Sequence, residues 1–207
     1  MSFITKFFIV LFFSLSFKNL FSLYELPQNL INEYKYLKSE YENFPTSNQA
    51  CFDFAMVCAY TGDIEYGFNV LKRVDISFAN TVISQNIKLI QSDGNEWRYY
   101  FKLAFGYYFI QNHDLTINTF KEVLNIDPNH IWAMAFISFV YGEQGDYDEC
   151  LFWAYKALQI EPDAAALHFL VANAYKLQGK YFKAARYFVS CVRLRTAEQT
   201  YRSSVYE

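Results

Sequence analysis

Four cysteines are the side chains in this sequence best suited to form disulfides or to bind a metal. Cys51 and Cys58 are seven residues apart, so on one helix they are separated by about 10 Å along the axis. A disulfide requires Cα atoms roughly 4.4–6.8 Å apart. Cys150 and Cys191 fall at small core positions of the helical pattern described below, and no pair has CxxC spacing. We predict buried free thiols, with a disulfide or a metal role as the alternative.

Three histidines could act as bases or metal ligands, but their positions favour neither role. His113, His130 and His168 do not lie at metal-ligand spacing from another histidine or cysteine. His168 occupies a position taken by Tyr100 and Met134 in the preceding units, which indicates packing. The sequence also lacks a G-x-S-x-G motif, a glycine-rich phosphate loop and a paired-carboxylate motif. We therefore expect a protein that is not an enzyme, with no catalytic residue, no metal and no cofactor.

The composition narrows the fold class before any motif is considered. Hydrophobic residues make up 53% of the 207 residues and aromatic residues 21%. The 7 glycines and 4 prolines are too few for a turn-rich β-sandwich, so helices are favoured. The net charge of −3 argues against a general nucleic-acid binder.

The first residues have the pattern of a targeting segment. An uncharged apolar run from Phe7 to Phe17 follows Lys6, which suits the core of a signal peptide but is short for a bilayer span of roughly 20 residues. Apolar residues resume after Lys18, so an uncleaved membrane anchor is the alternative. We expect residues 1–22 to be a signal peptide or an N-terminal membrane anchor. The protein would then be exported, and periplasmic or envelope-associated if its source is bacterial.

A period of 34 residues runs through the second half of the chain. Gly145 and Gly179 are 34 residues apart, and Tyr107, Tyr141 and Tyr175 recur at the same interval. A fixed period of this length is typical of stacked helical repeats. Each unit has the pattern of a helix, a tight turn and a second helix, with EQGDY and LQGKY as two of the turns. In the unit that has IQNHD instead, Asn112 can still tolerate a left-handed turn conformation, at some cost.

These residues resemble the tetratricopeptide repeat family, whose pattern combines small and aromatic residues at fixed positions of two helices. Small residues recur where the two helices of a unit would cross, and the resemblance covers about two thirds of the chain. It implies an all-α fold, an α-α superhelix of helix-turn-helix repeats. The recurring small positions are Ala55, Ala104, Ser138 and Ala172 in the first helices and Gly67, Thr116, Cys150 and Ala184 in the second helices.

The repeats divide the chain into units. An insertion separates a degenerate first repeat from three regular ones, and within it Ile83, Ile87 and Ile90 would share one helical face. The expected units are an N-terminal capping helix (24–46), a degenerate repeat (48–75), the insertion (76–96), three regular repeats (97–130, 131–164 and 165–197) and a C-terminal tail (198–207).

A second, nearly apolar stripe runs along the first helices of the repeats, beside the packing stripe. A helix that is hydrophobic all round must bury both sides or hold a partner. The resemblance implies that this stripe lines a concave groove where partner peptides lie. We predict that the groove binds an apolar or aromatic segment of another protein. The predicted groove residues are Arg98, Phe101, Phe105, Tyr108, Trp132, Phe136, Phe139, Phe169 and Asn173.

The alternative is a groove filled by the chain itself. The insertion, the N-terminal helix or a retained signal helix could occupy it. A carboxylate-clamping adaptor is not expected, because Phe105 and Phe139 stand where such a family member would carry an asparagine.

The last repeat is basic. No Asp or Glu occurs between Ala165 and Arg195, a stretch that contains Lys176, Lys180 and Lys183. The sequence therefore predicts either a solvated face or a surface that attracts acidic partners or anionic lipid headgroups. The function expected overall is a non-catalytic scaffold or adaptor. The alternatives are a carrier that holds a lipid or another apolar small molecule in the groove, and a structural homo-oligomer.

Overall fold

The computed structural model describes residues 26–206, so the expected signal peptide or anchor of residues 1–22 lies outside the described residues. The regular structure of this part is all-helical, which confirms the predicted fold class. The helices are α2 (Gln28–Asn43), α3 (Asn48–Thr61), α4 (Ile64–Leu71), a short 3-10 helix (Ile76–Phe78), α5 (Ala79–Ser92), α6 (Trp97–Phe109), α7 (His113–Ile126), α8 (Ile131–Glu143), α9 (Tyr147–Ile160), α10 (Ala165–Leu177) and α11 (Tyr181–Tyr206).

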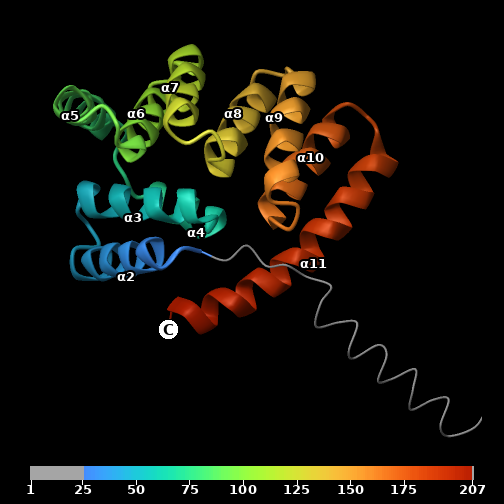
Figure 1. Cartoon of the computed structure of the whole chain (residues 1–207), viewed down its shortest axis with the longest axis horizontal. Coiled ribbons are helices and arrows are strands. Elements are labelled where there is room, and N and C mark those ends of the chain that lie inside the picture. Colours follow the sequence, from blue (N-terminus) through green and yellow to red (C-terminus); the bar gives the residue numbers. More distant parts are fainter. Residues whose placement is uncertain (1–25, 207) are drawn as a thin grey trace, which may run out of the picture.

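Helices α5 to α11 follow one another around an arc, each packed on the next (Figure 1). The regular repeats correspond to the pairs α6–α7, α8–α9 and α10–α11. Glycine permits the left-handed turn in two of these pairs, at Gly145 (φ +80°) and Gly179 (φ +73°). After the first of these turns, Asp146 accepts a hydrogen bond from the Glu149 N–H and caps α9.

In the turn between α6 and α7, the left-handed residue precedes the asparagine that the sequence offered for it. Gln111, not Asn112, adopts the left-handed conformation, with φ 58°. Asn112 instead caps α7, since its Oδ1 accepts a hydrogen bond from the Leu115 N–H at 3.1 Å. An amide side chain is favoured at this cap position, so the strained residue is the one before it.

The recurring small residues lie where paired helices approach each other. Ala55, Ala104 and Ser138 are fully or almost fully buried. The Ser138 hydroxyl donates to the backbone carbonyl of Cys150 at 2.7 Å, so the small positions of α8 and α9 are in direct contact. Close packing between helices requires small side chains at the crossing point, which explains the recurrence.

The insertion supplies the helix that precedes α6 in the arc. Helix α5 packs on α6, and a Cβ on Gly106 would lie 2.8 Å from Cγ1 of Ile83. The buried face of α5 consists of Ala79, Val82 and Asn86. Ile87 is exposed. The predicted face of Ile83, Ile87 and Ile90 is therefore wrong, because the buried face lies about one residue earlier in the sequence.

Because α5 packs on α6 at this place, the preceding helices α2 to α4, which we call the first unit, pack elsewhere. Helices α2, α3 and α4 form a separate layer that crosses the inside of the arc (Figure 1). Aromatic rings from α3 and α4 contact rings of α6 and α8: Tyr60 with Phe101 at 5.5 Å and Phe68 with Phe136 at 6.5 Å. The largest hydrophobic cluster of the described residues is therefore shared between this layer and the arc.

Helix α11 continues beyond the last repeat. The described part of the expected tail, residues 198–206, is helical and continuous with the rest of α11. The C-terminal half of α11 contacts α2, and Arg202 Nη2 donates to the Thr61 carbonyl at 2.7 Å. The end of the chain thereby closes back onto the first unit.

Candidate functional site

Four of the predicted groove residues belong to the hydrophobic core. Phe101 is 0% exposed and Phe105 3%, and Trp132 and Phe136 are also buried. The prediction that Phe101 and Phe105 lie open to a partner is wrong in this structure, because the α3–α4 pair covers them. The covering segment is the degenerate first repeat, which the sequence did not suggest for this role.

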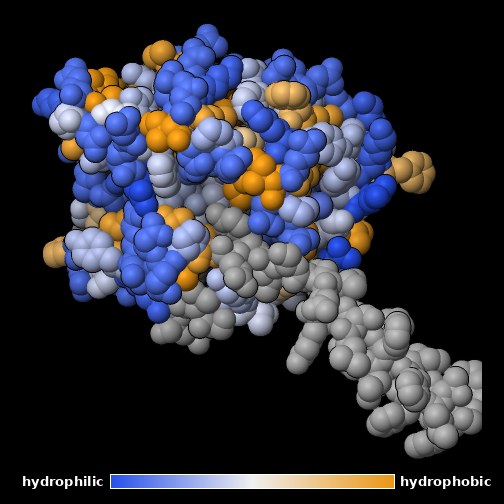
Figure 2. Space-filling view, in the orientation of Figure 1, coloured by the Kyte–Doolittle hydropathy of each residue, from blue (hydrophilic) through white to orange (hydrophobic). Residues whose placement is uncertain are grey.

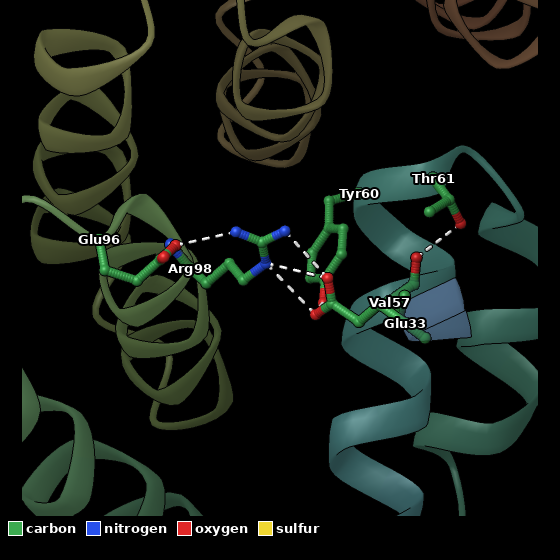
Figure 3. Close-up of polar contacts among 6 residues, drawn as sticks. All are labelled: Glu33, Val57, Tyr60, Thr61, Glu96 and Arg98. Carbon is green, nitrogen blue, oxygen red and sulfur yellow. Dashed lines mark hydrogen bonds and ion pairs between the residues drawn. The ribbon is translucent and has the colours of Figure 1, made fainter. Parts of the chain in front are cut away.

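Arg98 forms an ion pair that fixes the first unit to the arc (Figure 3). Its Nε and Nη2 donate to Oε2 of Glu33 on α2 at 3.0 and 2.9 Å, and its Nη1 donates to Glu96 at 3.0 Å. Tyr60 of α3 donates its hydroxyl proton to the same Glu33 carboxylate. Burial alone would lower the pKa of Arg98, but the hydrogen bonds and charge of Glu33 raise it. Arg98 is therefore a charged structural contact between α2 and α6.

Tyr108 and Phe139 lie at the edge of the filled region. The Tyr108 hydroxyl donates to Oε1 of Glu143 at 3.2 Å, and its ring lies 5.9 Å from that of Phe139. Burial and the Glu143 charge raise the pKa of Tyr108 to about 12, so the phenol is protonated at neutral pH. Both side chains are partly buried, and Phe139 lines the pocket described next.

A pocket of about 440 Å³ remains on the inside of the arc, beyond the part that α3 and α4 fill. Its wall from the arc comes from α8 and α10, its opposite wall from the α3–α4 turn and α4, and its third side from the C-terminal half of α11. The lining residues with apolar side chains are Ile64, Phe68, Trp132, Ala135, Phe136, Phe139, Ala165, Ala166, Phe169, Leu170 and Cys191.

Charged side chains surround this apolar surface. Arg195 forms an ion pair with Glu65, which joins α11 to α4. Glu198 Oε1 accepts a hydrogen bond from the Ala165 N–H at 2.8 Å and so caps α10, whose own N-cap residue Ala164 has no side chain to do so. Burial raises the pKa of Glu198, and the hydrogen bond from Ala165 opposes that shift. Helix α11 is therefore attached at both walls of the pocket.

The structure brings together four of the nine predicted groove residues at the pocket: Trp132, Phe136, Phe139 and Phe169. Phe169 is 51% exposed and is the most accessible ring among them. Asn173 is exposed but does not line the pocket. The contribution of α4 and α11 was missed, because repeat positions within one unit carry no information about contacts between the two ends of the chain.

The cysteines and histidines do not form a reactive centre in the described residues. All four cysteines are free and buried, as predicted, and burial raises the pKa of each thiol. His130 Nδ1 accepts a hydrogen bond from the Ala133 N–H at 3.1 Å and caps α8. Burial lowers the pKa of His130 to about 4. Residues 26–206 contain no cluster of side chains suited to hold a metal ion.

Comparison with known proteins identifies the fold. No family model and no curated protein sequence matches this chain. Among solved structures, a crystal structure of MamA superposes with a TM-score of 0.56 at 16% identity, over 81% of this chain and 89% of that one. A thermophilic tetratricopeptide-repeat protein of Thermus thermophilus gives 0.56 at 13% identity, over 83% and 86%. The chain therefore has the tetratricopeptide-repeat fold, an α-α superhelix.

Among residues 26–206, no helix combines the length and the apolar character needed to cross a bilayer.

Proposed function

We propose that this protein is a non-catalytic scaffold that binds an apolar segment of another protein in the pocket between α4, α8, α10 and α11. The observation that carries the proposal is that this pocket is the part of the inner face not covered by the first unit. Its walls are apolar and aromatic, and Phe169 presents an accessible ring at its edge. Large rings in a concave surface are typical anchors for a partner's side chains.

The shape of the site favours a short segment over a long helix. The α3–α4 pair fills the inner face beside α6, so a peptide cannot run along the whole arc. Charged residues at the rim, among them Glu65, Arg195 and Arg202, would border the apolar contact. We propose that one or a few bulky apolar side chains enter the pocket while polar groups of the segment remain at the rim.

The cellular setting is part of the same proposal. We propose, from the apolar run between Phe7 and Phe17, that the protein is exported or anchored and acts at the cell envelope. The partner would then be another envelope protein.

Filling the pocket tests the binding proposal. Ala166→Trp adds a large ring to the lining, and Phe169→Asp places a charge at its edge. Phe152→Asp is the matched control, since Phe152 is 57% exposed on α9 and does not line the pocket. We expect wild type and the Phe152 variant to retain the same partner on affinity capture from the native cell, and the two pocket variants to lose it. Retention of that partner by all four folded proteins would refute the proposal.

A carrier of an apolar small molecule is the second candidate. It is favoured by the pocket volume of about 440 Å³, which lies within the roughly 300–1,000 Å³ typical of small-molecule sites. Native mass spectrometry of gently purified protein separates the candidates. A bound lipid that Ala166→Trp displaces would favour the carrier, and a bound protein would favour the scaffold.

A further inference from the structure

The N-terminal half of α11 has an apolar face that no described helix covers. Phe182 is 97% exposed. An apolar side chain projects from the surface beside the turn between α10 and α11 in Figure 2. The exposed large apolar residues of this face are Tyr181, Phe182, Phe188, Val189 and Val192.

The position of α11 in the arc explains why this face is free. The second helix of each earlier regular repeat is covered by the helix that follows it: α7 by α8 and α9 by α10. Helix α11 is the last helix of residues 26–206, and it packs on α10 through Ala184, Cys191 and Leu194. Phe188 and Val189 follow Tyr181 and Phe182 by seven residues, or about two turns, and Val192 follows them by four and three residues. All five therefore lie on one side of α11, opposite the face that packs on α10.

Phe182 and Val189 lie on the side of α11 that faces away from the pocket, whereas Phe188 lies on the same side as the pocket-lining residue Arg195. Cys191 lines the pocket, whereas Val189 is two residues earlier and therefore points about 200° away around the helix. Loss of binding at one surface need not affect the other.

Positive charge accompanies the stripe. Lys183 and Arg186 are exposed, and Arg186 lies one turn from both Phe182 and Val189. Lys176 and Lys180 are exposed close to the turn that precedes α11. No acidic residue occurs between Ala165 and Arg195, so the cations near the stripe have no carboxylate from this stretch to neutralise them.

We propose that this face of α11 docks on an anionic lipid bilayer. Helices that bind at a membrane surface combine exposed aromatic and aliphatic side chains with Lys and Arg at the edge of the apolar face. The rings would enter the headgroup region, while Lys183 and Arg186 contact anionic headgroups. Each cation near such a surface contributes about fivefold to partitioning at low salt.

Charge argues against a second copy of this chain as the occupant. Two α11 faces in contact would bring Lys183 and Arg186 of both copies together without acidic partners. The other end of the arc offers no complement, because the only ionisable residue within α5 is Lys88. An anionic surface is the occupant that this distribution of charge fits.

Vesicle sedimentation with the full chain tests the inference. The probes are phosphatidylcholine vesicles with and without phosphatidylglycerol. The apolar test is Phe182→Ser with Val189→Ser, and the charge test is Lys183→Glu with Arg186→Glu. Phe152→Ser and Lys88→Glu are the matched controls, since both residues are exposed on other helices. Circular dichroism checks that each variant is folded.

We expect wild type to bind the anionic vesicles more tightly, with binding that weakens as salt rises. The apolar and charge variants should each lose at least about tenfold in affinity, and the controls should change it less than about twofold. Equal binding to both kinds of vesicle, or equal loss in variants and controls, would overturn the proposal and assign any binding to another part of the chain. Absence of binding would also overturn it and would leave the stripe as a contact for an acidic protein helix.

Discussion

Gly62 and Trp132 approach so closely that a Cβ on Gly62 would lie 2.2 Å from Cζ2 of the indole ring. Gly62 forms the turn between α3 and α4 with φ +84°, and Trp132 lies in the first turn of α8. The contact therefore joins the degenerate first repeat to the second regular repeat at one wall of the pocket. It depends on a residue that has no side chain and tolerates positive φ.

We predict that Gly62→Ala destabilises the protein by about 3 kcal/mol, because it combines a strained backbone with overpacking against the indole. Gly145→Ala is the control. Gly145 has φ +80°, but nothing lies within 4 Å of the added methyl group. That variant should lose only about 1 kcal/mol. Denaturant unfolding measures both, and equal losses would show that the turn does not press on Trp132.

The Glu33–Arg98 pair should couple α2 to α6. Both side chains are about three-quarters buried, and the contact is formed by several hydrogen bonds. A double-mutant cycle with Glu33→Gln and Arg98→Gln should give a coupling free energy of about 2 kcal/mol. The exposed pair Lys38–Glu42, with N···O 4.0 Å, should give about 0.3 kcal/mol in the same measurement. Similar values for the two cycles would contradict a docked first unit.

Glu198 supplies the N-terminal cap of α10 from a distant helix. We expect Glu198→Ala to lower the free energy of unfolding by about 1 kcal/mol, because the Ala165 N–H loses its acceptor. Glu198→Gln keeps an acceptor oxygen and should lose less. If both variants unfolded at the wild-type denaturant concentration, α11 would not be packed against the start of α10.

Acid should destabilise the protein partly through His130. Burial lowers the pKa of His130 to about 4, and the Asp127 charge only partly opposes that shift. The neutral ring is favoured in the folded state, so its contribution is complete above the unfolded pKa of about 6.5. It is lost as the pH falls from about 6.5 to about 4, to a total of up to about 3 kcal/mol.

His130→Asn tests this assignment, because asparagine keeps a capping acceptor but does not titrate. We expect the variant to be less stable at about pH 7 and to lose less stability than wild type between about pH 7 and about pH 4.5. Parallel losses of unfolding free energy over this range would exclude His130 as the group responsible.

The helix pairs of the regular repeats could be predicted because their determinants are local. Gly145 and Gly179 mark turns, and small residues such as Ala104 and Ser138 mark the crossings of neighbouring helices. The packing of the first unit depends on contacts between residues far apart in sequence, such as Glu33 with Arg98. No 34-residue period describes such a contact, so the covering of the inner face could not be predicted.

The candidate site could be predicted only in part, again because some of its contacts join residues far apart in sequence. Phe139 and Phe169 lie on the predicted groove face of successive repeats, and both line the pocket. Ile64 and Arg195 line it from outside the regular inner face, and the continuation of α11 beyond residue 197 brings the C-terminal wall into place. Apolar character alone did not distinguish Phe101, which the first unit buries, from Phe169, which it leaves accessible.

Photo-crosslinking in the native cell tests most directly where a partner binds. A photoreactive phenylalanine analogue replaces Phe169 at the pocket in one protein and Phe152 on the outer surface in another. We predict a discrete protein adduct from position 169, no such adduct from position 152, and loss of the adduct when Ala166→Trp fills the pocket. An adduct to the same protein from position 152, or one from position 169 that survives Ala166→Trp, would contradict binding in this pocket.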